Sequence, residues 1–266
     1  MSQFLRDEFI KNVTISEYTL NSLNDFFLDR ALETNKALGG ENAPEDKRLL
    51  ASYIIRFDNK GYRLYDFKDV LKFYSQAGDV ERIFFVIDSH ESIKTNRVYG
   101  TYLELKLDAK DLNNCYLVAA GEDGNWVDSA FSGVVYLLKK SHNRNNLIRN
   151  SWTQFLVQIF GVAIGFLLSL LAGVKIAPHL SIDNSFVISF LFAFLIFSNA
   201  WGFINQQILR LLNFSFPNLR FKRSGSDALH WLIQALIGGI VVAFTIFLLG
   251  KSFDLVGRML GELVTK

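Results

Sequence analysis

Residues 151–174 read SWTQFLVQIFGVAIGFLLSLLAGV, and none of these side chains carries a charge. The chain has three such uncharged runs, of 25, 26 and 23 residues, which lie between Arg149 and Lys175, between Asp183 and Arg210, and between Asp227 and Lys251. A helix rises about 1.5 Å per residue and the hydrocarbon core of a bilayer is about 30 Å thick, so about 20 apolar residues suffice to cross it. The second half of the chain is therefore predicted to form three transmembrane helices, over about residues 152–174, 185–209 and 228–250.

The two halves of the chain differ in charge. Residues 1–150 hold 20 of the 28 lysines and arginines and 22 of the 26 aspartates and glutamates, so their formal charge is −2, whereas the remaining residues carry +4. A first half this polar is predicted to be a soluble domain, and about 150 residues are enough to bury one core. Neither charge is large enough to indicate nucleic-acid binding by itself.

Basic residues near the predicted spans indicate the topology. Eight of them precede the first span or lie between the second and the third: Lys139, Lys140, Arg144, Arg149, Arg210, Arg220, Lys222 and Arg223. The opposite side has Lys175, Lys251, Arg258 and Lys266. By the positive-inside rule we expect a bacterial inner (cell) membrane protein with its N-terminus in the cytoplasm and its C-terminus outside. The first residues contain charges and no apolar h-region, so no signal peptide is expected.

The first half is predicted to have an α+β fold. Helix formers over residues 3–11 and 15–37 predict an N-terminal helical arm. Residues 52–57 and 62–65 predict a hairpin in which Gly61 supplies the positive φ. Further strands are expected over residues 81–88, 102–108 and 115–120, and helices over residues 67–76 and 126–138.

The predicted organisation is an α+β cytosolic domain followed by an all-α three-helix transmembrane domain. Its parts are a helical arm (1–40), an α+β sensor domain (41–140), a juxtamembrane linker (141–150) and a transmembrane domain (151–266) that ends in an amphipathic helix (252–264). The linker is polar and short enough to transmit movement from the sensor to the spans.

No enzyme signature is present, because the chain lacks Walker A, GxGxxG, HExxH, CxxC and GxSxG sequences. Its four histidines are scattered, and Cys115 is its single cysteine, so neither a metal site nor a cofactor is predicted. Asp88, His90 and Glu91 follow a predicted strand closely, as acid-base groups do, but a solvated loop is the simpler interpretation. We therefore expect a protein that is not an enzyme.

A candidate ligand site lies at the predicted hairpin and the helix after it, where cations and an aromatic ring gather: Arg56, Lys60, Tyr62, Arg63 and Lys68. Guanidinium and ammonium groups bind phosphates, and aromatic rings stack on bases, so this composition suits a nucleotide or oligonucleotide. Aspartates are interspersed with these cations, and an ordinary charged surface is the alternative.

Small residues recur at every fourth position along the first predicted span: Gly161, Gly165, Ser169 and Gly173. The third predicted span contributes Gly239. Such faces allow helices to approach closely, within one subunit or between subunits, and they predict a homo-oligomer in the lipid bilayer. Polar residues gather toward the cytoplasmic ends of the spans. The candidate pore-lining residues are four of these and a glycine on the same helix stripe: Gln158, Ser198, Asn199, Gln206 and Gly202. Interhelical hydrogen bonding is the alternative explanation for them.

This arrangement of a cytosolic domain, a short connector and three spans resembles the membrane effectors of bacterial antiphage defence, among them the Hailong-type channel effectors. The resemblance rests on architecture and size over the whole chain, and no functional residue is carried over from it. It implies an oligomeric ion channel gated by a nucleotide or oligonucleotide signal in antiviral defence. Two alternatives stay open: a membrane-anchored scaffold or adaptor that binds a cytosolic signalling protein, and an enzyme at the membrane face that uses Asp88 and His90 as acid and base.

Overall fold

The computed structural model describes residues 3–222, 235–236 and 239. In chain order, the strands and α-helices are β1 (Phe4–Phe9), β2 (Val13–Ser16), α1 (Glu17–Ala37), β3 (Leu49–Phe57), β4 (Lys60–Leu64), α2 (Phe67–Gln76), β5 (Val80–Ser89), α3 (His90–Lys94), β6 (Tyr102–Asp108), β7 (Tyr116–Gly121), α4 (Gly124–Lys140), α5 (Ser151–Ile176), α6 (Ser185–Ser215) and β8 (Leu219–Lys222). Short 3₁₀ segments are η1 (Gly40–Asn42), η2 (Glu45–Lys47), η3 (Leu112–Asn114), η4 (Arg144–Leu147) and η5 (Ala177–His179).

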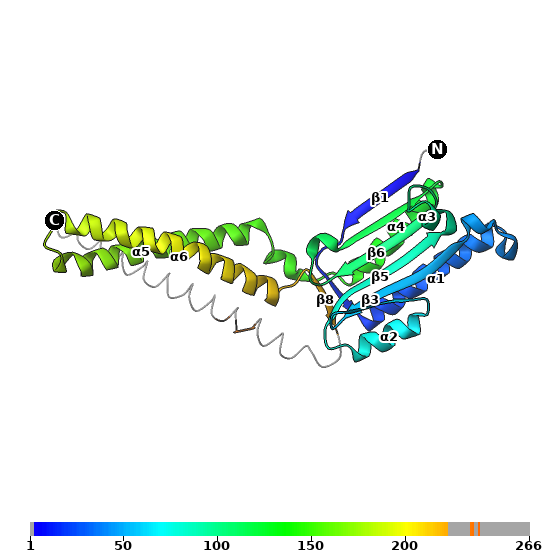
Figure 1. The fold of residues 1–266 in the computed structure, drawn as a ribbon, viewed down its shortest axis with the longest axis horizontal. Helices are drawn as coiled ribbons and strands as arrows, with labels where there is room; N and C mark the ends of the chain where they lie inside the picture. The colour runs from blue at the N-terminus through cyan, green and yellow to red at the C-terminus, as the bar shows by residue number, and fades with distance from the viewer. Residues whose placement is uncertain (1–2, 223–234, 237–238, 240–266) are drawn as a thin grey trace, which may run out of the picture. The chain divides into compact units, whose positions relative to one another are not determined.

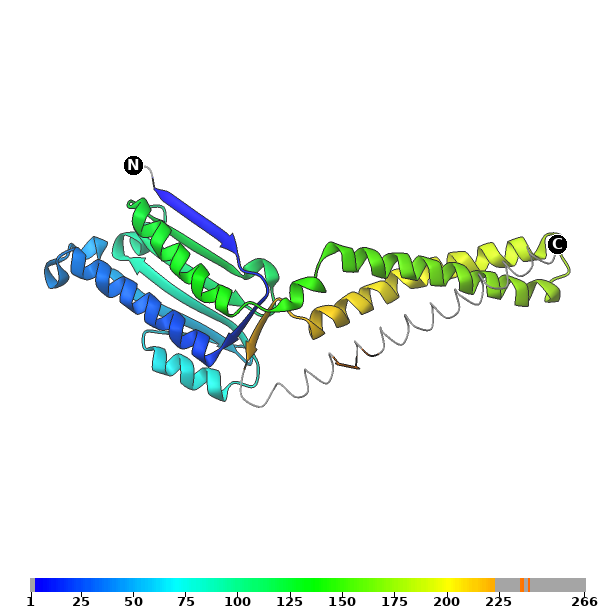
Figure 2. The ribbon, with the colours of Figure 1, turned by 180° about the vertical axis from the view of Figure 1, so that it is seen from behind.

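The first half forms the predicted α+β domain around one antiparallel sheet. Its strand order is β1-β7-β6-β5-β3-β4. Helices α1, α2 and α4 cover one face of this sheet (Figure 2), and within the described residues the opposite face carries no long helix (Figure 1). We call the opposite face the open face.

The alternation of side chains explains why the sheet has one buried and one open face. Successive residues of a strand point to opposite faces, so Leu103, Leu105 and Leu107 of β6 all lie beneath the helices, where each is fully buried. β5 is an interior strand and contributes Phe85 to the same core. The strands and helices expected between residues 67 and 138 are confirmed.

The hairpin of β3 and β4 is confirmed, but the residues that make its turn differ from those predicted. Phe57 pairs with Lys60, so the loop has only Asp58 and Asn59, with φ of 47° and 62°. These values fit a two-residue turn of the type that matches strand twist, in which Asp and Asn tolerate positive φ. Gly61 lies inside β4 opposite Arg56, so the prediction that it supplies the positive φ is wrong.

The predicted helix over residues 3–11 is also wrong. Phe4–Phe9 form an edge strand of the main sheet, paired antiparallel with β7. The helical arm predicted over residues 1–40 is therefore part of the domain: β1 extends the sheet, and α1 buries Leu20, Leu23 and Phe27 against it. An edge strand makes ladder bonds on one side only, so the pairing with β7, which is distant in sequence, decides its conformation.

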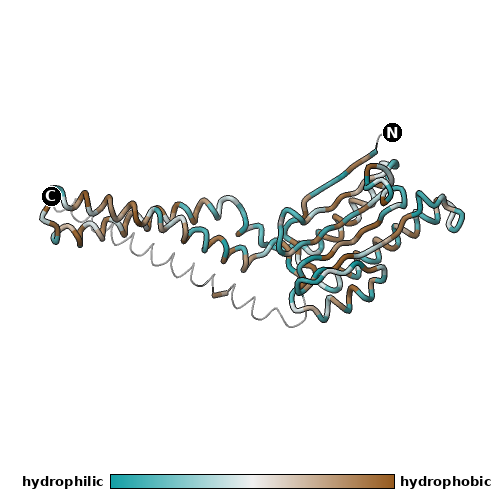
Figure 3. Tube along the Cα trace, in the orientation of Figure 1, coloured by the Kyte–Doolittle hydropathy of each residue, from teal (hydrophilic) through white to brown (hydrophobic). Residues whose placement is uncertain are grey.

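Two helices are long and apolar enough to cross a membrane. The most apolar 18-residue windows of α5 and α6 have mean hydropathies of 2.4 and 2.0, and only 11% of each window is buried. Hydrophobic residues predominate along both helices (Figure 3). The third predicted span and the amphipathic helix over 252–264 lie outside the described residues, apart from residues 235–236 and 239, which are helical.

Candidate functional site

The structure divides the predicted ligand residues between the two faces of the sheet. Arg63 lies opposite Ile54, and Arg56 opposite Gly61, on the open face. Lys60 and Tyr62 belong to the helix-covered face, because neighbouring residues of a strand alternate. Lys68 lies in the first turn of α2. The five residues therefore do not form one cluster.

Two of the predicted ligand residues already have structural partners. The Tyr62 ring stacks on Phe73 of α2 with centroids 4.9 Å apart and planes inclined by 14°, and Phe57 stacks on both rings. Arg56 pairs with Glu81, with Nε and Oε2 2.9 Å apart. Glu81 also accepts hydrogen bonds from the Asn59 backbone, from Lys110 and from Arg56, in that order of effect, and these lower its pKa. Arg56 and Tyr62 therefore stabilise the hairpin.

Arg63 instead lines a groove on the open face, together with Tyr65. The groove has a volume of about 500 Å³ and an apolar floor that includes Ile54, Phe84 and Val86. In the part of the chain that the structure describes, no ion pair engages Arg63. An available guanidinium beside an exposed tyrosine ring is the combination that binds phosphate and base together.

The far wall of this groove is a strained loop that places Arg97 on the sheet. Asn96 and Arg97 both have positive φ, 51° and 65°. The Arg97 guanidinium pairs with Asp88 of β5 and Glu104 of β6 and lies 4.9 Å from the centre of the Tyr102 ring. Burial lowers the pKa of Arg97, but the hydrogen bonds and charges of the two carboxylates outweigh burial and raise it. A positive φ is costly at arginine, which lacks the tolerance of asparagine and aspartate, and such strain concentrates at functional sites.

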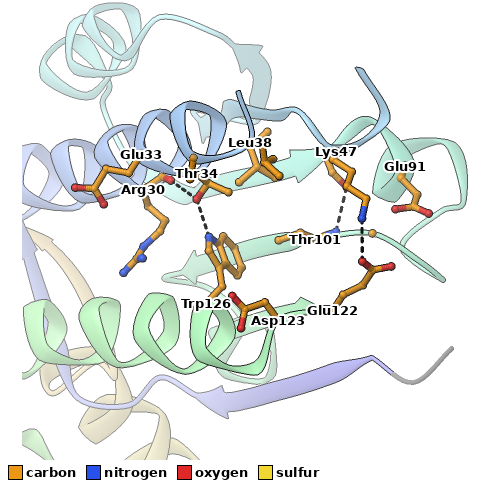
Figure 4. Close-up of a pocket in the computed structure, with 14 residues that line it drawn as sticks. Arg30, Glu33, Thr34, Leu38, Lys47, Glu91, Thr101, Glu122, Asp123 and Trp126 are labelled. Carbon is orange, nitrogen blue, oxygen red and sulfur yellow. Dashed lines mark hydrogen bonds and ion pairs between the residues drawn. The ribbon is translucent and has the colours of Figure 1, made fainter. Parts of the chain in front are cut away.

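A second cavity lies on the helix-covered side, at the end of the sheet between α1 and α4 (Figure 4). Its volume is about 480 Å³. Trp126 projects from α4 toward α1, and its indole Nε1–H donates to Thr34 Oγ1 over 2.8 Å. Lys47 and Glu122 form an ion pair at the other end of the cavity, 3.1 Å apart. None of the predicted ligand residues lies here, and four carboxylates against two cations make its lining unfavourable for phosphate.

The second half of the chain returns to the α+β domain through an unpredicted strand. β8 follows α6 and pairs with β2 in parallel, with Val13 opposite Leu219 and Ser16 opposite Lys222. Leu219 is buried in the domain core, and Phe221 packs against it. We call β2, β8 and the hydrogen bonds around them the clasp.

Side-chain amides complete the clasp. Asn218 Oδ1 accepts from the Asn12 backbone N–H over 2.8 Å, and its Nδ2 donates to the Ile10 carbonyl over 3.2 Å. The backbone N–H of Asn143, in the linker before α5, donates to the Asn12 carbonyl over 2.7 Å. Asn12 has φ of 58°, and its buried Oδ1 accepts no hydrogen bond from the described residues. The segments that lead into α5 and out of α6 are therefore held at one point of the domain.

The start of α5 is also joined directly to the end of α6. Asn145 Nδ2 donates to the Pro217 carbonyl over 2.8 Å, and an Arg149 guanidinium N–H donates to the Phe216 carbonyl over 3.1 Å. Phe216 is the C-cap of α6, so this bond satisfies a helix-end carbonyl group. The predicted linker is consequently an ordered part of the junction rather than a free tether.

Helix α2 connects the hairpin with the clasp. Tyr74 is buried, and its hydroxyl donates to the Lys222 carbonyl over 2.8 Å, with its ring 6.3 Å from that of Phe221. The preceding residue, Phe73, carries the stack with Tyr62. Because Tyr62 is next to Arg63 on β4, a continuous set of contacts runs from the open-face groove through α2 to β8.

The small residues of α5 that were predicted to pack helices face α6. Gly161, Ser169 and Gly173 are buried, and a Cβ at Gly161 would lie only 1.6 Å from Trp201 Cε2. Gly165 is more open, because a Cβ there would lie 3.8 Å from Phe197 Cβ, at ordinary contact distance. Close contact between α5 and α6 therefore depends on the small residues of α5.

The candidate pore-lining residues lie on exposed surface of the two helices. Ser198, Asn199, Gly202 and Gln206 of α6 are all exposed, as is Gln158 of α5. A Cβ at Gly202 or at Gly239 would meet no atom of the described residues within 4 Å. The α6 residues are available for contact with a further helix, another subunit or water.

Comparisons with protein-family models, curated proteins and solved structures found no match. Among the described residues, His, Cys, Asp and Glu do not gather in groups of three that could hold a metal ion. The residues that sequence patterns did not single out are Asn12, Asn218, Tyr74 and Arg97. The tolerance of asparagine for positive φ was the one local signal available, and only for Asn12, because the partners of the other three are not evident from local sequence.

Proposed function

We propose that this chain is an oligomeric membrane effector in which ligand binding to the α+β domain opens a path for ions between apolar helices. The observation that supports it best is the clasp. A domain that only needs an anchor can be joined by a flexible linker, whereas here both ends of the α5–α6 pair are hydrogen-bonded to the domain. Attachment at both ends allows a change in the domain to pull on the helices.

The membrane part of the proposal is supported by length, composition and exposure. Helices α5 and α6 leave most of their apolar surface uncovered, and surfaces of that size are covered by lipid or by protein. The exposed polar positions of α6, Ser198, Asn199 and Gln206, would be unfavourable against lipid. They suit the wall of an aqueous path between subunits, which requires an oligomer.

The sensor part of the proposal is placed at the open-face groove. Arg63 supplies the cation, Tyr65 the aromatic ring, and Arg97 with its two carboxylates a preformed polar wall. A nucleotide or oligonucleotide is the signal expected there. Its phosphate would engage Arg63, and displacement of β4 would pass through Tyr62 and α2 to β8.

Ion efflux from liposomes containing the purified full chain tests this function, with a panel of cyclic and linear oligonucleotides as the signals. We expect efflux that depends on one of them and is lost in Arg63→Ala but retained in Arg48→Ala, an exposed arginine outside the groove. The mass of the detergent-solubilised protein is measured in parallel. A strict monomer, together with liposomes that stay tight under every signal, contradicts the proposal.

A membrane-anchored adaptor is the second candidate, and the open face favours it. Among the described residues no long helix covers this face, and it exposes Leu5, Phe9 and Leu50, with exposed fractions of 60%, 56% and 43%. Apolar side chains in this setting are typical of a surface that binds another protein. The adaptor predicts no efflux, so the same liposome experiment separates the two functions.

A further inference from the structure

The clasp borders a cavity whose lining is cationic and rich in amides. The cavity has a volume of about 360 Å³ and is lined by Lys11, Arg149, Asn113 and Asn146, by the clasp residues Asn12 and Asn218, and by Phe9. Among the described residues, no carboxylate belongs to this lining. Guanidinium, ammonium and carboxamide N–H groups are all donors, and together they suit an anion.

The neighbouring cavity extends the same chemistry along the linker. Its volume is about 720 Å³, and it shares Phe9, Lys11, Asn12 and Asn146 with the first cavity. It adds Lys139 and His142, with Glu8 as the one carboxylate from the described part of the chain. The two cavities therefore bring three permanent cations, Lys11, Lys139 and Arg149, to one continuous surface with a single opposing charge among these lining residues.

Arg149 places this surface at the beginning of the apolar helices. It precedes the first residue of α5 by two positions and is bonded to the C-cap of α6. Trp152 and Phe214, one turn or less inside the two helices, are each 70% exposed. Tryptophan is enriched at the headgroup level of membranes, where it and basic residues act as anchors.

We infer that this cavity is a phosphate-ester site at the clasp, formed by Lys11, Arg149 and Asn146, and that its ligand is the phosphate of an anionic lipid headgroup. The inference rests on the proposed function in one respect, which is that α5 and α6 cross the bilayer and so bring Arg149 to headgroup depth. A phosphate bound here contacts the domain through Lys11 and the helices through Arg149. Occupancy therefore holds the clasp together, and the lipid acts as a structural part of the gate.

Binding by the detergent-solubilised full chain tests the site, with dioctanoyl phosphatidylglycerol as the lipid probe and sn-glycerol 1-phosphate and inorganic phosphate as the soluble probes. Dioctanoylglycerol, which has the chains and no phosphate, is the control ligand. Affinity is measured by tryptophan fluorescence and by the shift in Tm. We expect the phospholipid to bind and Lys11→Gln/Arg149→Gln to weaken its affinity roughly tenfold or more, because two charge-assisted contacts are lost.

The matched control is Lys36→Gln/Arg48→Gln, which neutralises one exposed lysine and one exposed arginine outside the cavity and is expected to bind as the unmodified protein does. Asn146→Asp is a second variant, in which a carboxylate at an exposed position repels phosphate without removing a clasp bond. If sn-glycerol 1-phosphate or inorganic phosphate binds with the same dependence on Lys11 and Arg149 and the phospholipid does not, the phosphate site stands and the lipid source is overturned.

Two results overturn the inference as a whole: equal affinity in the unmodified protein and in both cavity variants, or a response to dioctanoylglycerol equal to that of the phospholipid. Binding is measured without ion flux. A phosphate site in a protein that leaves liposomes tight is therefore distinguished from a channel that lacks such a site.

Discussion

The side-chain oxygen of Asn218 accepts a hydrogen bond from the backbone N–H of Asn12 over 2.8 Å, across 206 positions of sequence. Both residues are buried, with exposed fractions of 6% and 7%. Asn12 ends the connection between the first two strands, and Asn218 directly precedes β8. This one contact therefore joins the N-terminal part of the α+β domain to the end of the apolar helix pair.

Asn218→Leu is expected to weaken the clasp by about 1–3 kcal/mol, because a buried backbone N–H at Asn12 and a carbonyl at Ile10 lose their partner. Hydrogen exchange should accelerate in residues 12–16 and 219–222, while the main sheet stays protected. Asn42→Leu, at an exposed position in η1, is the control. Unchanged exchange in both segments would show that Asn218 does not hold β8 in place.

Tyr74→Phe is expected to remove the hydrogen bond between α2 and β8 while leaving the packing of the core intact. The substitution keeps the buried ring and removes the hydroxyl that donates to the Lys222 carbonyl, at a cost of about 1 kcal/mol. The domain should remain folded, and signal-dependent efflux should decrease because α2 holds β8 less firmly. Tyr18→Phe, with a tyrosine 80% exposed, serves as the control. A signal response equal to that of the unmodified protein would exclude α2 as the route.

Gly161→Ala and Gly202→Ala should differ, although both replace a glycine in an apolar helix. At Gly161 the added Cβ would lie 1.6 Å from Trp201 Cε2, so either the Trp201 ring or the helices must shift, at a cost of about 1–3 kcal/mol. At Gly202 no atom of the described residues lies within 4 Å, and alanine is the better helix former by about 1 kcal/mol. The Tm of the purified protein should fall only in the first variant. If Gly202→Ala instead changes the oligomer or its efflux, Gly202 is in contact between subunits.

Cys115 makes the stability of the domain depend on pH in the alkaline range. Burial raises the pKa of its thiol from 9.0 to about 11. Between these values the folded protein binds the proton and the unfolded chain releases it, so the free energy of unfolding falls as pH rises, by about 2–3 kcal/mol in all. Burial also raises the pKa of Tyr53, to about 12. That shift lowers the free energy of unfolding only above pH 10, where the tyrosine of the unfolded chain begins to ionise.

Denaturant unfolding at pH 8 and at pH 10 measures this effect. Cys115→Ala should lose less stability between the two pH values than the unmodified protein, because all other titrating groups are common to both. The difference in pH dependence is the readout, since the substitution also removes the thiol's hydrogen bond to the Asp108 carbonyl. An identical fall in both proteins would show that the thiol titrates alike in the folded and unfolded chains.

Local patterns predicted the interior of the α+β domain well. β6 alternates leucine with charged residues, and that alternation fixes its register and its buried face without knowledge of its neighbours. Helix α4 and the hairpin carry equally local signals. The apolar helices α5 and α6 follow from length and hydropathy alone.

The misses were elements whose conformation depends on distant partners. β1 has a composition compatible with a helix, and only its pairing with β7 makes it a strand. The four residues of β8 are too short for a periodic signal, and their partner is β2, near the other end of the chain. The candidate ligand residues are divided for a simpler reason. Neighbours along a strand, such as Tyr62 and Arg63, point to opposite faces of the sheet.

A disulfide across the clasp can be introduced to hold its two strands together. Thr14 and Arg220 are paired in the parallel ladder, and adjacent strands lie about 4.8 Å apart, within the Cα separation that a disulfide accepts. Thr14→Cys/Arg220→Cys should therefore be close enough to oxidise. The native thiol does not compete, because Cys115 is buried and its raised pKa keeps it protonated.

This cross-link tests whether the strands of the clasp move during gating. If gating separates β8 from β2, the oxidised double variant should show no signal-dependent efflux, and reduction should restore it. The two single variants carry the same substitutions without the cross-link, including loss of the hydrogen bond that Thr14 Oγ1 accepts from Asn143 Nδ2, and their efflux is the reference for the oxidised double variant. Full efflux from the oxidised double variant would mean that the clasp stays closed in the open state, and the signal would then have to reach the helices through the linker before α5.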